Sequence, residues 1–143
     1  MAKFSELGVS TDIIVGKGIE IEDLFGQHIL VEKTIIKPKN FPGKNSRGLR
    51  MQMQICFPIW NENGTYQVDT TGNPIGERRS CFTGSDVLIG AIQEASSKLP
   101  SINEERKNKG LPLISLYPMD TTIVKIGKCF QFSGYFQLPV MPD

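Results

Sequence analysis

An alternation of apolar and polar side chains decides the fold, and it occurs in Leu49-Arg50-Met51-Gln52-Met53-Gln54-Ile55-Cys56-Phe57. Successive side chains of a β-strand point to opposite faces, so both methionines, Ile55 and Phe57 share one face while the polar residues share the other. The pattern predicts a strand with one face in the core and the other in water.

Further strands are expected on both sides of this one. The stretch before it is rich in β-branched residues and ends at Pro38, which cannot donate to a strand ladder. Near the other end of the chain, Gly127-Lys128 separates two apolar runs, and a leading glycine is typical of a type II′ hairpin turn. The expected strands are residues 28–37, 49–57, 77–82, 121–126 and 129–133. Residues 18–22 are expected to add a strand or turn, and Tyr66-Gln67-Val68 to form one arm of a small hairpin.

One helix is predicted between the third and fourth of these strands. Thr83-Gly84-Ser85-Asp86 offers capping oxygens, Leu88, Ile92 and Ala95 form one apolar stripe, and Pro100 is expected to end the helix. Residues 101–110 are expected to form a polar loop. The predicted fold class is therefore all-β with one helix: a five-stranded OB-type antiparallel β-barrel, with the helix between strands 3 and 4. A β-sandwich is the alternative, but it usually needs about seven strands.

Composition indicates one small globular domain covering residues 1–143, with a net charge of +1. No apolar run is long enough to span a membrane and the N-terminus lacks a signal-peptide pattern, so we expect a cytoplasmic protein. Cys56, Cys81 and Cys129 are isolated from one another, which favours buried reduced thiols. A zinc site of these cysteines with His28 is the weaker alternative. We expect no metal and no cofactor.

Positive charge is concentrated in one part of the chain. The six cations that follow one another without an acid among them are Lys33, Lys37, Lys39, Lys44, Arg47 and Arg50. The next acid after this run is Glu62. A nucleic-acid backbone requires unpaired cations along its path, and single strands add bases that stack on aromatic rings. The distribution therefore favours nucleic-acid binding.

Enzymatic functions find little support in the sequence. The chain has one histidine and lacks the local motifs of serine hydrolases and zinc proteases. A metal-dependent nuclease would need a carboxylate cluster, which the sequence does not reveal. We expect that the protein is not an enzyme.

The candidate nucleic-acid site follows from OB geometry, in which the ligand crosses strands 2 and 3 between the 1–2 and 4–5 loops. Arg78 and Arg79 are adjacent on a strand, so only one of them is expected to face the ligand. Trp60 and Tyr66 are expected either to stack on bases or to seal a hairpin, whereas Phe130 and Phe132 are expected in the core. The candidate residues are Lys37, Lys39, Phe41, Lys44, Arg47, Arg50, Gln52, Gln54, Trp60, Tyr66, Arg79, Lys125 and Lys128.

Two segments carry a family resemblance: Cys81-Phe82-Thr83-Gly84-Ser85-Asp86-Val87-Leu88-Ile89, and Thr121-Thr122-Ile123-Val124-Lys125-Ile126-Gly127-Lys128-Cys129-Phe130-Gln131-Phe132-Ser133. The chain resembles small OB-fold single-stranded-DNA-binding proteins of phages and mobile genetic elements. The resemblance implies an OB fold and sequence-tolerant binding during DNA replication or recombination, and it assigns no DNA-contacting residue. Bacterial members usually end in an acidic tail that recruits partners, whereas this chain ends with the apolar stretch Gln137-Leu138-Pro139-Val140-Met141-Pro142-Asp143.

The expected partner is single-stranded DNA, with RNA as an open alternative. The expected location is inside a cell, with the host cell of a phage as one option. A homo-oligomer and contacts with replication or recombination proteins are compatible with the sequence. The alternative function is a protein-interaction or scaffold module of a phage or mobile-element assembly that does not bind nucleic acid.

Overall fold

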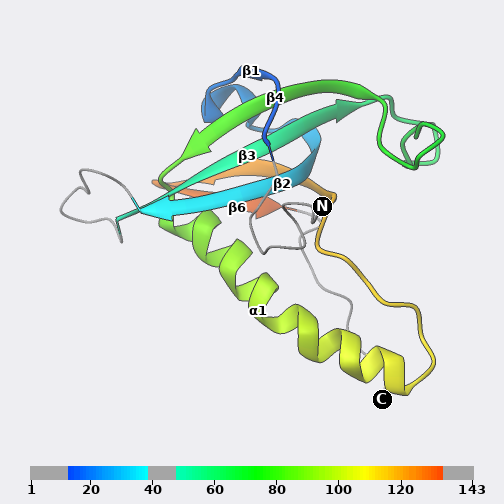
Figure 1. Ribbon diagram of the computed structural model, residues 1–143. Coiled ribbons are helices and arrows are strands. Elements are labelled where there is room, and N and C mark those ends of the chain that lie inside the picture. Colours follow the sequence, from blue (N-terminus) through cyan, green and yellow to red (C-terminus); the bar gives the residue numbers. More distant parts are fainter. Residues whose placement is uncertain (1–12, 39–47, 134–143) are drawn as a thin grey trace, which may run out of the picture.

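The computed structural model describes residues 13–38 and 48–133, which form a mostly β fold with a single α-helix (Figure 1). The strands are β1 (Lys17–Gly18), β2 (His28–Pro38), β3 (Leu49–Pro58), β4 (Gly76–Thr83), β5 (Met119–Ile126) and β6 (Cys129–Ser133). The helices are the short 3-10 helix η2 (Ile21–Leu24) and α1 (Asp86–Asn108). The coarse class predicted from the sequence, all-β with one helix, is confirmed.

The strands form one six-stranded sheet in the order β1-β4-β3-β2-β5-β6. Strand β1 runs parallel to β4, and the other neighbours are antiparallel. The expectation of a closed five-stranded barrel is therefore wrong. The physical reason lies at the edge of β4, where Lys17 and Gly18 pair with Arg79 and Ser80 and occupy the position that a closing strand would need. Within the described ranges the sheet is open, with β1 and β6 at its edges.

The open sheet is nevertheless curled, because β2 takes part in both halves of it. The first residues of β2 pair with β5, and its residues from Leu30 to Pro38 pair with β3 across a β-bulge between Val31 and Lys33. Figure 1 shows β5 and β6 lying behind β2 and β3 as a result. The inner surface of this curl holds the core.

Side chains from β3, β5 and α1 fill the core. Met51, Met53 and Ile55 of β3 are fully buried, as their alternation predicts. Leu88 from α1 and Ile123 from β5 meet them in one apolar cluster. Phe130 and Phe132 pack against the same cluster. Both are partly buried, so they lie at the edge of the core in which they were expected.

Helix α1 begins as predicted but ends later than predicted. The Oγ atom of the N-cap residue Ser85 accepts a hydrogen bond from the backbone N–H of Leu88 at 3.2 Å. Pro100 lies inside the helix and does not end it, so the expected loop at residues 101–110 is wrong. A helix-interior proline removes one hydrogen bond, but contacts beyond it offset that loss.

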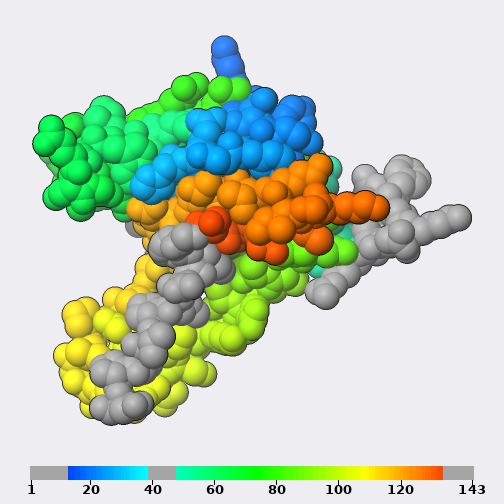
Figure 2. Space-filling view, turned by 180° about the vertical axis from the view of Figure 1, so that it is seen from behind, coloured from blue at the N-terminus to red at the C-terminus, as the bar shows by residue number. Residues whose placement is uncertain are grey.

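These contacts tie the distal half of α1 to the chain that follows it. Asn103 exchanges two hydrogen bonds with the backbone of Ile114, at 2.9 and 2.8 Å. Gly110 has a φ of 72° and ends the helix. The N–H of Gly110 donates to the carbonyl of Lys107, and the N–H of Leu111 donates to the carbonyl of Arg106. Figure 2 shows this part of the chain projecting from the sheet as an arm.

Two predicted turns are also present. Gly127 has a φ of 62° and no other residue type in the described ranges has a positive φ, so the β5–β6 turn is type II′. Between β3 and β4, bridges join Trp60 to Tyr66 and Val68 to Pro74. The small hairpin expected around Tyr66 is therefore confirmed. Within the described ranges, no helix combines the length and apolar character needed to cross a bilayer.

Candidate nucleic-acid interface

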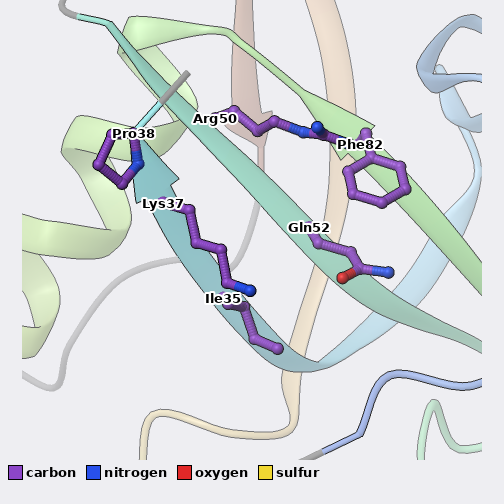
Figure 3. Close-up of a pocket in the computed structure, with 6 residues that line it drawn as sticks. All are labelled: Ile35, Lys37, Pro38, Arg50, Gln52 and Phe82. Atoms are coloured by element: carbon purple, nitrogen blue, oxygen red, sulfur yellow. The ribbon is translucent and has the colours of Figure 1, made fainter. Parts of the chain in front are cut away.

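A groove lies on the face of the sheet that points away from the core, which we call the outer face. The strand register places Lys37 of β2 opposite Arg50 of β3, and it places Gln52 of β3 between Ile35 of β2 and Phe82 of β4. These side chains surround a hollow of about 350 Å³. Its lining residues are Ile35, Lys37, Pro38, Arg50, Gln52 and Phe82, drawn in Figure 3.

An aromatic ring and a guanidinium group form the wall of this groove. The Cζ atom of Arg50 lies 4.1 Å from the centre of the Phe82 ring, which is a cation–π contact. Phe82 is 49% exposed because its neighbours Cys81 and Thr83 take the inward positions of β4 and are buried. A large aromatic side chain half in water, next to the exposed guanidinium group of Arg50, is a combination that suits a ligand with flat rings and phosphates.

A second hollow of about 270 Å³ adjoins the same pair. It is lined by Arg50 and Phe82 together with Thr83 and Gly84, which lead into α1. The two hollows therefore share the Arg50–Phe82 pair.

Gln52 supplies a fixed polar group at the floor of the groove. Its Nε2 atom donates a hydrogen bond to Ser80 Oγ at 3.1 Å, and Ser80 is buried. This bond holds the amide in place. Figure 3 shows Gln52 on the strand next to that of Phe82. The Oε1 atom of Gln52 is thus positioned to accept a hydrogen bond from the edge of a bound ring.

Three of the predicted site residues, Lys37, Arg50 and Gln52, are brought together in this groove. Lys125 and Lys128 are exposed but do not line it. Lys128 belongs to the β5–β6 turn, and Lys125 lies near the end of β5. This turn lies at the same end of the molecule as the end of β2 and the start of β3 (Figure 1). The remaining predicted residues of the β2–β3 connection lie outside the described residues: Lys39, Phe41, Lys44 and Arg47.

Gln54 is not available as predicted, because the N-terminal segment crosses the outer face above it. The backbone N–H of Val15 donates to Gln54 Oε1 at 3.0 Å, and Gln54 Nε2 donates to Glu32 Oε1 at 2.9 Å. Gln54 is 5% exposed as a result. Residues 13–18, which we call the strap, therefore divide the outer face, and the expectation that the polar side of β3 is wet throughout is wrong.

The two arginines of β4 are likewise engaged within the protein. Arg78 donates to both carboxylate oxygens of Glu32, at 2.9 and 2.8 Å. Arg79 points to the opposite face from Phe82 and donates to the carbonyls of Lys17 and Gly18, at 3.2 and 2.8 Å. Arg79 therefore holds β1 on the sheet, and it lies away from the groove to which the sequence assigned it.

Trp60 and Tyr66 form a separate aromatic cluster. The Trp60 ring stacks on His28 with centroids 3.8 Å apart, and Tyr66 meets it edge-on at 5.9 Å. His28 also contacts the carboxylate of Asp120, and burial raises the pKa of Tyr66. Along β3, about 30 Å of strand separates Trp60 from Arg50. Of the two predicted roles, sealing the hairpin is the one that these contacts support.

Phe82 was not among the predicted site residues, although the sequence contains a signal for it. If Cys81 faces the core, alternation along the strand turns Phe82 outward, beside the outward-facing Gln52. The same reasoning applies to the cysteines. Cys56 and Cys81 are buried as expected, whereas Cys129 is exposed because Phe130 takes the inward position.

Comparison with protein-family models, curated proteins and solved structures finds no match. Within the part of the chain that the structure describes, no three His, Cys, Asp or Glu side chains come close enough to hold a metal ion. The zinc arrangement of the three cysteines with His28 is therefore wrong.

Proposed function

We propose that the protein binds single-stranded DNA without strong sequence preference, through the groove around Phe82. The observation that carries the proposal is the cation–π pair of Arg50 and the half-exposed Phe82, which lines two hollows. Phe82 offers a surface on which any base can stack, while Lys37 and Arg50 offer positive charge to the backbone. RNA shares these chemical features and remains an alternative ligand.

We further propose that the sheet is an open relative of the OB arrangement. Apart from β1, the element order is three strands, one helix and two strands, with β5 joined to β2. In OB domains, ligands cross the strands that correspond here to β3 and β4. The groove lies on those strands, which supports single-strand binding independently of the resemblance between sequences.

Fluorescence anisotropy of labelled oligo-dT at two salt concentrations, with a duplex as comparison, tests the proposal. Replacing Phe82 with alanine removes one stacking surface, which is worth about 1–3 kcal/mol, or roughly 5- to 150-fold in Kd. Arg50→Gln should weaken binding and reduce the magnitude of the log–log salt slope by about 0.7, because one phosphate contact is lost. Lys107→Gln makes the same charge change on the distal half of α1 and should leave Kd unchanged.

Equal affinity for single strand and duplex would contradict the proposal, and so would the absence of binding to either. The second result, together with a salt-insensitive oligomer on a sizing column, would favour a protein-interaction or scaffold module. A loss of affinity in Lys107→Gln equal to that in Arg50→Gln would show that binding depends on overall charge and not on the groove.

A further inference from the structure

The Arg50–Phe82 pair forms the common wall of the two hollows on the outer face. The larger hollow is otherwise bordered by residues of β2 and β3, and the smaller one by Thr83 and Gly84. The volumes of about 350 and 270 Å³ are similar, and both lie near the lower end of the range for small-molecule sites. Each hollow therefore has room for at least one base.

We infer that this pair is a wedge that separates two consecutive bases, so that the site takes an unstacked dinucleotide step and prefers pyrimidine to purine single strands. The inference rests on the proposed function and adds the substrate preference of the same groove. One base occupies the hollow next to Gln52, and the following base occupies the hollow next to Gly84.

The strand register holds the wedge in place. Met51 of β3 pairs with Thr83 of β4, and Gln52 pairs with Phe82, so Arg50 and Phe82 are diagonal neighbours across an antiparallel pair. Arg50 belongs to β3, which lies between β4 and β2, and Phe82 belongs to β4, which lies between β1 and β3. A single-stranded nucleic acid that crosses the groove must therefore pass over the pair. The bound nucleic acid, and not the sheet, changes conformation by separating its bases.

Base preference follows from the free energy needed to separate adjacent bases. Purine tracts stack strongly on themselves in the free strand, and pyrimidine tracts stack weakly, so a wedge penalises purines more. A flat surface without a wedge would accept a stacked pair of bases from one side and would not impose this penalty. The ratio of the Kd for oligo-dA to that for oligo-dT therefore reports the wedge, whereas the Kd for oligo-dT alone reports the groove.

The test measures this ratio for the wild-type protein and for Phe82→Ala, with oligomers of equal length and with Leu113→Ala as the control. Leu113 lies in the chain that follows α1 and is 62% exposed, so its truncation removes exposed apolar surface that does not line the groove. We expect a wild-type ratio of at least about fivefold, the lower end of what one stacked base contributes, and a ratio close to unity in Phe82→Ala. Leu113→Ala should keep the wild-type ratio. Thermal melts check that each variant is folded. Because Phe82 is half exposed, we expect Phe82→Ala to remain folded.

A second measurement needs no variant. Two adjacent 2-aminopurines within oligo-dT quench each other while stacked, so wild-type protein should raise their fluorescence by pushing them apart. An unchanged signal, a wild-type ratio within twofold, or an equal loss of affinity for oligo-dA and oligo-dT in Phe82→Ala would each overturn the wedge. These outcomes leave single-strand binding intact, whereas failure to bind any oligomer would overturn the proposed function itself.

Discussion

Replacing Glu32 with glutamine should destabilise the folded protein by about 1–2 kcal/mol while leaving single-strand affinity unchanged. The Glu32 carboxylate accepts hydrogen bonds from Arg78 Nε and Nη2 and from Gln54 Nε2, at 2.9, 2.8 and 2.9 Å. Its side chain is 12% exposed, and that of Arg78 is 24% exposed. Removing the charge therefore leaves a largely buried guanidinium without its counter-ion.

The magnitude follows from how much compensation remains. Breaking a fully buried ion pair costs about 3–5 kcal/mol. Here the loss should be smaller, because Arg78 also donates to the carbonyls of Gly76 and Pro74, at 3.1 and 2.6 Å, and water reaches part of the guanidinium. Glutamine also keeps one acceptor oxygen for the remaining donors. One charge-assisted hydrogen bond contributes about 1.5–3 kcal/mol. Because of these features, the expected loss in the free energy of unfolding is at or just below the lower end of that range, about 1–2 kcal/mol.

Urea unfolding followed by the fluorescence of Trp60, the single tryptophan, measures this loss. A double-mutant cycle with Arg78→Met should give a coupling energy of about 1 kcal/mol or more. The matched control is Glu94→Gln, which breaks the exposed i,i+4 pair with Lys98 and should change stability far less. Equal effects of Glu32→Gln and Glu94→Gln would refute the reasoning, and so would a lower DNA affinity of folded Arg78→Met.

Three further outcomes are expected. Gly16→Ala should destabilise the folded protein by more than about 1 kcal/mol, because Gly16 has a φ of 109° and a Cβ there would lie 2.3 Å from a backbone oxygen of β4. Gly18→Ala is the control, since a Cβ at that position meets no atom within 4 Å, and urea unfolding compares the two variants. Gly110→Ala should cost about 1 kcal/mol and increase hydrogen exchange in the last turn of α1, since its positive φ favours glycine. Burial raises the pKa of the Cys81 thiol to about 12, so in a thiol-reagent assay near pH 8 the exposed Cys129 should react before Cys81. The free energy of unfolding should also fall as the pH rises above about 9, because the unfolded chain then loses a proton from Cys81 that the folded chain keeps.

Local patterns predicted most of the strands, because each strand depends on residues close to it in the chain. The alternation from Leu49 to Phe57 identified β3 and its core face. The Gly127-Lys128 pair identified the β5–β6 hairpin and its turn type. Backbone geometry and side-chain parity act over a few residues, so one sequence suffices to read them.

Long-range contacts caused the errors, and they have no local signal. Pro100 was expected to end the helix. The part of α1 after Pro100 is stabilised by hydrogen bonds between Asn103 and Ile114, which lies beyond the helix. The polar side of β3 was expected to be wet, but the strap covers Gln54 from a position 39 residues earlier in the chain. A barrel was expected to close, but Lys17 and Gly18 occupy the edge of β4. Each case requires knowledge of which distant segment packs where.

The same contacts decide which cations can meet a ligand. Counting charges along the sequence treats Arg50, Arg78 and Arg79 alike, yet two of them are held by internal acceptors on β1, β2 and the β3–β4 connection. The strap and the Glu32–Arg78 pair thus close the middle of the outer face and leave its Phe82 end open. An interior ion pair contributes little net stability by comparison with apolar packing, but it fixes one arrangement of the segments that it joins. The placement of the groove at the end of the sheet near Pro38 and Gly84 is therefore a consequence of how the middle of the sheet is covered, and ligand contacts should be sought at that end first.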